Sequence, residues 1–198
     1  MDITYKVEFF TDWHCGSGLS AGAYVDALVV KDSDGLPYLP GKTVKGLLRE
    51  AAEDIAALRS GDDDELRESR MAEIRKGFGH FDGNDDSGHG ALRGTAHFTN
   101  AVIPSTERQA ITAGALQPYI YRTISSTAIG DDGTAVDKSL RRMEVTAPCA
   151  LEGKILNLPD GEDFREIITD AMRYIKRLGQ NRNRGLGRCS FSPIQTEQ

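Results

Sequence analysis

Residues Gly35–Gly46 read GLPYLPGKTVKG, and this stretch sets the fold because a stiff turn leads directly into a helix. Pro37 and Pro40 have fixed φ angles, which makes the turn rigid. From Thr43 onward, apolar residues recur at the spacing of one helical face. The pattern ends near Ser60, and the glycine that follows is typical of a helix C-terminus. The stretch therefore predicts a turn followed by a helix over residues 43–60.

The tripeptide Gly41-Lys42-Thr43 also ends nucleotide-binding P-loops, which have the pattern G-x-x-x-x-G-K-[ST]. The first glycine of that pattern would stand at position 36, but this chain has Leu36 there. The two prolines lack the N–H groups that a phosphate cradle needs. The spacing argues against an ATP or GTP site and leaves Lys42 to be explained in another way.

The composition is that of an ordinary globular protein, and its 198 residues fit a single domain. No apolar run approaches the roughly 18 residues that span a membrane. The start, MDITYKVEFF, lacks the pattern of a secretion signal. Cys15, Cys149 and Cys189 are odd in number and share no C-x-x-C spacing. We therefore expect a reducing, cytoplasmic setting, with no zinc site and no membrane contact.

The net charge of −6 conceals separate acidic and basic clusters. Any single basic cluster is compatible with solvated surface, but three clusters beside glycine-rich turns favour a nucleic acid. The basic residues form these groups: Lys42, Lys45 and Arg49; Lys138, Arg141 and Arg142; and Arg173, Lys176, Arg177, Arg182, Arg184 and Arg188.

The order of the expected elements predicts an α+β fold with a ferredoxin-like (RRM-like) βαββαβ core. Two insertions interrupt this core, a lid at about 62–90 and a region at about 104–144 that carries a protruding loop or hairpin. Both helices of the core would cover one sheet face and leave the other face free. Strands are expected at residues 4–11, 24–30, 91–103, 144–153 and 187–193, and helices at 43–60, 65–76 and 163–178.

The lid contains FDGNDDSG, residues 81–88. In this stretch Asp82, Asn84 and Asp86 have the spacing of the first three ligands of a calcium-binding loop. Ser87 stands where that loop requires glycine, so we expect a flexible acidic loop instead.

Four stretches, in this order, resemble the RAMP superfamily and, more narrowly, the repeated backbone subunit of type III CRISPR–Cas effector complexes. Together they cover most of the chain, which would be a single RAMP domain over residues 1–198; the last stretch alone would be a weak signal. They are Trp13–Gly18 (WHCGSG), Val25–Gly46 (VDALVVKDSDGLPYLPGKTVKG), Gly133–Gly153 (GTAVDKSLRRMEVTAPCALEG), which is similar to the family's thumb hairpin, and Gly185–Phe191 (GLGRCSF).

The resemblance implies binding of a guide RNA and a target RNA, together with other effector subunits and further copies arranged head to tail. Helix N-termini and arginines favour phosphates, and glycines allow close backbone approach, so these contacts would hold RNA without reading its sequence. His14 alternatively is a surface or core histidine. The expected RNA-binding residues are His14, Gly16, Gly18, Lys42, Lys45, Arg49, Arg141, Arg142, Arg182, Arg184, Gly185, Gly187 and Arg188.

The resemblance also implies that Asp26, in AYVDALVV, is needed to cut target RNA with a divalent metal, Mg²⁺. Its carboxylate would bind the metal or orient the attacking 2′-OH. The thumb around residues 133–142 would splay one nucleotide for in-line attack. Alternatively, Asp26 is a turn or capping residue in a subunit that does not cleave. Asp32 and Asp34 are expected to be turn residues.

Other functions stay open. A related RAMP endoribonuclease that processes CRISPR precursor RNA normally uses a histidine and two ferredoxin-like halves, for which this chain is short. A subunit that coats RNA without cleaving it differs only in the behaviour of Asp26. An unrelated RNA-recognition domain would need exposed aromatic residues on its central strands, and His97 and Phe98 are the nearest candidates.

Overall fold

The computed structural model describes residues 2–22, 24–81, 91–161 and 163–194. In that part of the chain, no helix is both long enough and apolar enough to cross a membrane. The elements are β1 (Ile3–Phe9), β2 (Tyr38–Leu39), α1 (Gly41–Ser60), α2 (Asp64–Phe78), β3 (Gly79–Phe81), β4 (Ala91–Arg93), β5 (His97–Phe98), β6 (Ala101–Val102), α3 (Ser105–Ala113), the 3₁₀ helix η1 (Gln117–Ile120), β7 (Tyr121–Ser126), β8 (Arg141–Thr146), β9 (Ala150–Leu156), α4 (Asp163–Tyr174), the 3₁₀ helix η2 (Arg182–Arg184) and β10 (Cys189–Pro193).

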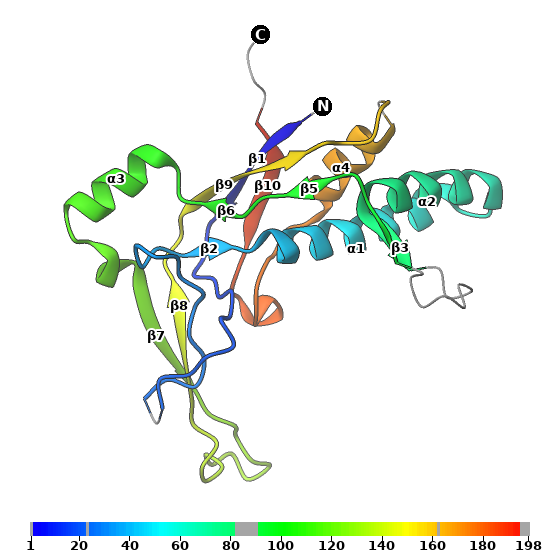
Figure 1. Ribbon diagram of the computed structural model, residues 1–198. Coiled ribbons are helices and arrows are strands. Elements are labelled where there is room, and N and C mark those ends of the chain that lie inside the picture. The colour runs from blue at the N-terminus through cyan, green and yellow to red at the C-terminus, as the bar shows by residue number, and fades with distance from the viewer. Residues whose placement is uncertain (1, 23, 82–90, 162, 195–198) are drawn as a thin grey trace.

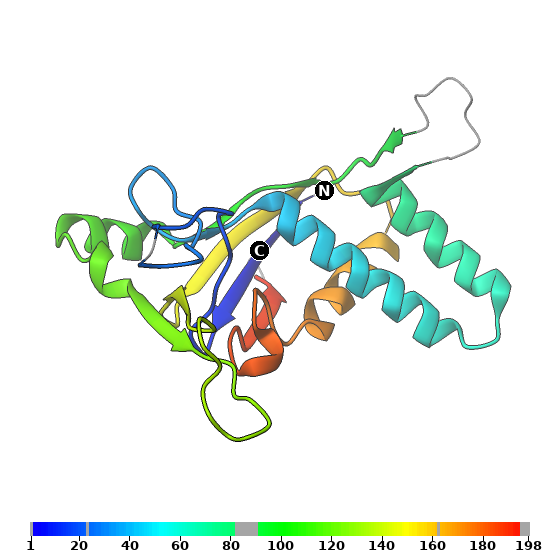
Figure 2. The same cartoon turned by 90° about the horizontal axis from the view of Figure 1, so that it is seen from below.

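The main sheet is antiparallel and has the strand order β10-β1-β9-β6-β2, with β5 also paired to β9. On β1, Val7 lies opposite Phe191 of β10 and Leu151 of β9, and all three side chains are buried. Helices α1 and α4 contact each other and contribute to the same hydrophobic core as these strands (Figures 1 and 2). The fold is therefore α+β, as predicted.

Helix α1 begins at Gly41, two residues before its predicted start. The amide of Gly41 donates to Oδ1 of Asn100 over 2.8 Å. A Cβ atom at this position would lie 2.1 Å from the carbonyl oxygen of Phe98. The glycine of the P-loop-like tripeptide is thus required because the helix start packs directly on β5.

The single strand predicted over residues 91–103 is wrong, because the chain forms three short strands there. Strand β4 pairs with β3 in a separate hairpin, whereas β5 and β6 join the main sheet. Gly94 marks the change of partner, since a Cβ atom on it would lie 2.2 Å from the carbonyl oxygen of Gly77. This close contact bends the chain away from a continuous strand.

Helix α4 ends at Tyr174, four residues before its predicted end. The next residues pair with the start of β10 instead: the carbonyl of Lys176 accepts a hydrogen bond from the amide of Cys189. Arg177 also forms an isolated bridge with Arg188. The apolar pattern continues past the helix because Ile175 and Leu178 are still buried.

The region 104–144 contains the predicted hairpin, formed by β7 and β8, and this hairpin projects from the main sheet (Figure 1). Helix α3 in the same region was not predicted, since none of its residues is buried and no apolar face is visible in the sequence. Residues 24–30 form isolated bridges rather than a strand. The helix predicted in the lid is α2, whereas the acidic loop of the lid falls largely outside the described residues. The division into one domain with two insertions stays a prediction.

Candidate nucleic-acid interface

The root of the projecting hairpin, residues 121–126 and 141–146, is bound on its outer side by an earlier segment of the chain. The amide of Asp26 donates to the carbonyl of Arg142 over 2.8 Å. The amide of Arg142 donates back to Oδ2 of Asp26 over 2.7 Å. The amide of Glu144 donates to the carbonyl of Ala27 over 3.0 Å. Strand β8 therefore lies between β7 and this segment.

Glu144 is the centre of the polar contacts at the hairpin root. Its Oε2 accepts the amide of Val29 over 3.0 Å, and its Oε1 accepts Nζ of Lys31 over 2.8 Å. Lys31 also lies 3.9 Å from the centre of the Tyr121 ring, which adds a cation–π contact. These contacts tie the segment before the turn to both strands of the hairpin.

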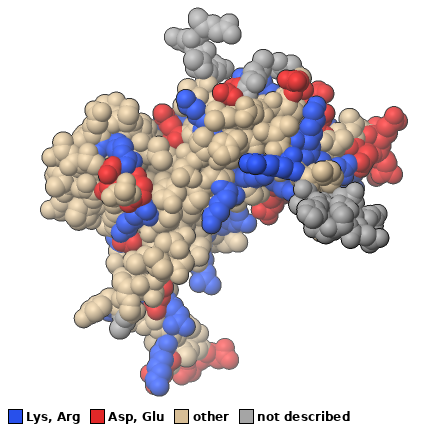
Figure 3. All heavy atoms as spheres, viewed as in Figure 1, with Lys and Arg blue, Asp and Glu red and all other residues tan. Residues whose placement is uncertain are grey.

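A cleft of about 390 Å³ opens beside the hairpin root, between β8 and the loop that precedes β10. Four of the predicted site residues line it: Asp26, Arg141, Arg142 and Arg184. The structure thus brings Asp26 and three arginine residues from three distant parts of the chain to one cleft. Figure 3 shows Lys and Arg side chains along the projecting hairpin, with Asp and Glu beside them at its tip, and a second group of Asp and Glu at the far end of α2.

The loop before β10 owes its shape to glycines with positive φ angles. Gly187, with φ +68°, is required because a Cβ atom would lie 1.8 Å from the carbonyl oxygen of Leu178. Its amide donates to the carbonyl of Asp12, which anchors the loop to the end of β1. Gly185 also has a positive φ, but a Cβ atom there would meet nothing within 4 Å. Gly185 is exposed and leaves bare backbone at the surface.

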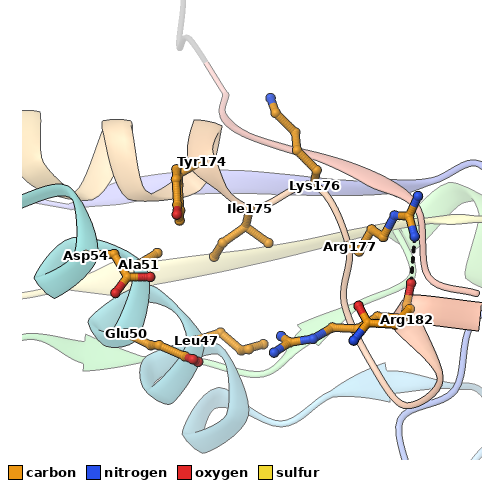
Figure 4. A pocket seen from close by; sticks show the side chains of 10 residues that line it. Leu47, Glu50, Ala51, Asp54, Tyr174, Ile175, Lys176, Arg177 and Arg182 are labelled. Carbon is orange, nitrogen blue, oxygen red and sulfur yellow. Dashed lines mark hydrogen bonds between the residues drawn. The ribbon is translucent and has the colours of Figure 1, made fainter. Parts of the chain in front are cut away.

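Arg182 lies apart from the Asp26 cleft. It lines a second groove of about 290 Å³ together with Lys176 and Arg177 (Figure 4). Nη1 of Arg177 donates to the carbonyl of Arg182 over 2.9 Å. Glu50 and Asp54 of α1 form the opposite wall, so both signs of charge face this groove. Because two acidic residues line this groove and one lines the Asp26 cleft, the groove is the poorer phosphate site.

Arg188 lies at a third place, near the end of β1. Its guanidinium carbon is 5.7 Å from the centre of the Phe10 ring, and its amide donates to Oγ1 of Thr11. Its side chain is exposed. Three arginines of this basic group were predicted to bind RNA, and they face different parts of the surface: Arg182, Arg184 and Arg188.

The start of α1 differs from the anion site predicted there. The amide of Gly41 is bonded to Asn100, and the amides of Thr43 and Val44 are bonded to the carbonyl of Pro40. These three amides already have acceptors within the protein and are not free for a phosphate. Lys42 is exposed, so a phosphate contact at this position would rest mainly on its side chain.

Lys45 and Arg49, the other two residues of the Lys42 group, differ in their contacts within the protein. Arg49 donates to Oε1 of Glu53 over 2.7 Å and to the carbonyl of Gly79 over 3.2 Å. Lys45 is half-buried. An RNA contact by Arg49 would have to compete with its contacts inside the protein.

His14 is fully buried, with 0% of its surface exposed. Its Nδ1 lies 2.6 Å from the carbonyl oxygen of Glu144, and its own carbonyl accepts the amide of Gln180. His14 is therefore a core histidine, and the ring offers no surface for direct contact with RNA. Gly16 and Gly18 are exposed nearby, and Gly18 has a positive φ.

A group of contacts around Asp32 was only partly foreseen. Its Oδ1 accepts the amides of Asp34 and Leu36, as expected of a turn residue. Arg108 of α3 also bonds to Asp32 over 2.7 Å and to Asp34. Burial of Asp32 opposes its ionisation, but the hydrogen bonds from Arg108, Leu36 and Asp34 outweigh it and lower its pKa. No sequence pattern links Arg108 to the turn.

The protein alone does not offer a complete metal site at Asp26. Across the described ranges, no group of three or more His, Cys, Asp or Glu residues could hold a metal ion. Asp26 supplies a single carboxylate, one oxygen of which already accepts the amide of Arg142. Mg²⁺ normally needs further oxygen ligands, which would have to come from RNA and water.

Comparison with known families assigns the chain. Its sequence matches the family model of the RAMP superfamily over residues 6–190. The chain belongs to the RAMP superfamily. The resemblance noted in the sequence is therefore confirmed for almost the whole length of this RAMP protein.

Solved structures agree with this assignment at the level of the fold. The RAMP protein is similar to a chain in the cryo-EM structure of the type III-B Cmr-beta bound to cognate target RNA, with 10% identity, a TM-score of 0.64, and 98% and 97% of the two chains covered. The apo state of type III-B Cmr-beta gives 12% identity, a TM-score of 0.65 and 98% coverage of both chains. At such identities the likeness shows the fold alone. No curated protein matches the sequence.

Proposed function

We propose that this RAMP protein is a cytoplasmic, guide-RNA-binding backbone subunit of a type III CRISPR effector complex, and that Asp26 serves the cleavage of target RNA. The cleft that brings Asp26 together with Arg141, Arg142 and Arg184 carries this proposal. Guanidinium groups suit phosphates, and a carboxylate among them suits a neighbouring hydroxyl group. The similar folds found in type III-B Cmr-beta structures support the same interpretation.

In the proposed reaction, the carboxylate of Asp26 accepts the proton of a 2′-OH while that oxygen attacks the adjacent phosphorus. Arg141, Arg142 and Arg184 offset the charge that develops on the phosphoryl oxygens. The bond to the 5′-oxygen of the next nucleotide breaks, and this leaving oxygen takes a proton from water. The products are a 2′,3′-cyclic phosphate and a 5′-hydroxyl group.

A divalent ion at this site would be coordinated by the protein and the RNA together. Asp26 would supply a carboxylate ligand, and phosphate oxygens and water would supply the rest. Such an ion would add positive charge near the phosphate under attack. We propose Mg²⁺ on this basis.

A second candidate is a subunit that coats guide RNA without cleaving its target. The bond from the Arg142 amide to Asp26 favours it, because a capping aspartate is what such a subunit would retain. A processing enzyme and an RNA-recognition domain fit the structure less well. A histidine-dependent processing enzyme finds no support at His14, whose ring is buried. An RNA-recognition domain would need exposed strand aromatics; of the two candidates on β5, His97 is exposed but Phe98 is buried.

The proposed core is ferredoxin-like. Taking β5 and β6 as one broken strand gives the order β1-α1-β5/β6-β9-α4-β10, which is a βαββαβ arrangement. Copies of the subunit would contact one another head to tail, because asymmetric contacts build an open filament along RNA.

Cleavage of a labelled target RNA by the assembled complex tests the proposal. The assay is run once with Mg²⁺ and once with EDTA. We expect regularly spaced products, ending in 2′,3′-cyclic phosphates, from the wild type and from the control Asp131→Ala. Asp131 is exposed on the loop of the hairpin. Asp26→Asn should cleave at least about 100-fold more slowly while binding guide RNA normally. If the wild type binds guide RNA but does not cleave the target, the coating subunit is favoured. If the wild type does not bind guide RNA, both the cleaving subunit and the coating subunit are rejected.

A further inference from the structure

Strand β8 has a complete set of hydrogen bonds on the side that faces away from β7. Three alternate residues, Arg142, Glu144 and Thr146, direct both their amide and their carbonyl to this side, as alternate residues of an antiparallel strand do. The amide of Thr146 donates to the carbonyl of Trp13 over 2.8 Å, and the amide of Glu144 donates to the carbonyl of Ala27 over 3.0 Å.

The third amide of this set, that of Arg142, is bonded differently. Its acceptor is not a backbone carbonyl but Oδ2 of the Asp26 side chain, over 2.7 Å. The amide of Asp26 completes the pair by donating to the carbonyl of Arg142 over 2.8 Å. Asp26 therefore occupies the place of a strand partner at the end of the set nearest the hairpin loop.

We infer that Asp26 is a positioning residue that fixes the root of the β7–β8 hairpin, whatever part it has in cleavage. Two bonds to one residue set the register between the Asp26 segment and β8. They also hold Arg142, which lines the cleft beside Asp26. Replacing Asp26 with alanine would leave the Arg142 amide without its partner and loosen the last outer bond of β8.

An alanine variant at this position therefore combines two effects. Asp26→Ala removes both the charge and the hydrogen-bond acceptor, so lost cleavage could follow from a displaced hairpin. Asp26→Asn removes the charge but keeps an oxygen in a side chain of the same shape. The asparagine variant therefore separates the two roles.

Amide hydrogen exchange measured by NMR on the free protein tests the inference. In Asp26→Ala we expect the Arg142 amide to exchange about tenfold faster than in the wild type, which is the effect of losing one hydrogen bond. The amides of Glu144 and Thr146 should change much less. In Asp26→Asn, Arg142 should stay within about threefold of the wild-type rate, since the amide oxygen still accepts. Asp131→Ala should leave all three rates unchanged.

Equal Arg142 exchange in the wild type and Asp26→Ala would overturn the inference, as would an asparagine variant that exchanges as fast as the alanine variant. If Asp26→Ala fails to fold, the asparagine variant still decides, because it must protect Arg142 as the wild type does. The cleavage assay is a separate test. An asparagine variant that protects Arg142 and cleaves normally would reject the catalytic role and keep the positioning role.

Discussion

The body of the molecule and its hairpin lobe are held together by different forces. The body is the main sheet with α1 and α4, and its strands and helices share one buried apolar core. The hairpin lobe is β7, β8, α3 and residues 26–36, in which few side chains are fully buried. Its contacts are ion pairs and hydrogen bonds, such as those of Glu144 and Arg108. The stability of the body therefore depends on packing, and that of the lobe on polar partners.

The largest effect should come from tight backbone packing in the loop that leads into β10 of the body. Gly187→Ala should lower the free energy of unfolding by about 3 kcal/mol or more, because the added Cβ meets the Leu178 carbonyl in addition to the positive φ. Gly185→Ala, with open space around it, should cost about 1 kcal/mol. Urea unfolding of the two variants measures the difference. Equal costs would show that backbone conformation alone sets the effect.

Removing the polar centre of the lobe should have the next largest effect. Glu144→Ala leaves the Val29 amide and Lys31 without an acceptor and should cost about 2 kcal/mol. Glu144→Gln keeps an oxygen for one of these donors and should cost about half as much. Glu65→Gln, an exposed position on α2, is the control. Unchanged stability in Glu144→Ala would mean that the lobe is not held by its polar contacts.

The ion pairs of Arg108 should contribute less and should depend on pH. Arg108→Met should cost about 1 kcal/mol at pH 7, since both partners are partly exposed. Because the folded pKa of Asp32 lies below its ordinary value of 3.8, this contribution is complete above that pH. It is lost as pH falls through the lowered pKa. Unfolding at pH 7, 5 and 3 should therefore show a difference from wild type that persists at pH 5 and shrinks at pH 3.

Ionisation of the cysteine thiols should not affect the free energy of unfolding at neutral pH. Burial raises the pKa of Cys149 to about 11 and that of Cys189 to about 12. The unfolded thiols ionise near the ordinary value of 9.0, so stability should fall as pH rises above about 9. In the folded protein at pH 8, iodoacetamide should alkylate both thiols slowly, as mass spectrometry would show. Rapid alkylation of Cys189 would mean that the start of β10 opens easily.

The body could be predicted largely from sequence because apolar periodicity reports burial directly. The alternation of β1 and the helical faces of α1 and α4 are visible without a structure. The exceptions are local: Gly94 breaks a predicted strand through a contact with Gly77 that no pattern reveals.

The hairpin lobe could be predicted only in outline. The ion pairs and hydrogen bonds that connect its separate segments join residues 74 to 130 positions apart, and polar contacts leave no period in the sequence. Asp26 was identified through the resemblance to the RAMP superfamily, whereas Arg142 and Arg184 were already visible as members of basic clusters. Glu144 was missed, and the sequence left open whether His14 is buried or contacts RNA.

The outer bonds of β8 have a mechanical consequence. Since Asp26 and Ala27 are both bonded to β8, these residues and the hairpin form one stiff arm, whereas Trp13, which is bonded to Thr146 and stacked on Phe9 of β1, belongs to the body. The arm meets the body between Thr146 and Ala150, where the chain enters its pairing with β1. If a bound RNA tilts the hairpin, Asp26 travels with it. The spacing between its carboxylate and the Arg142 backbone would then stay the same at every tilt.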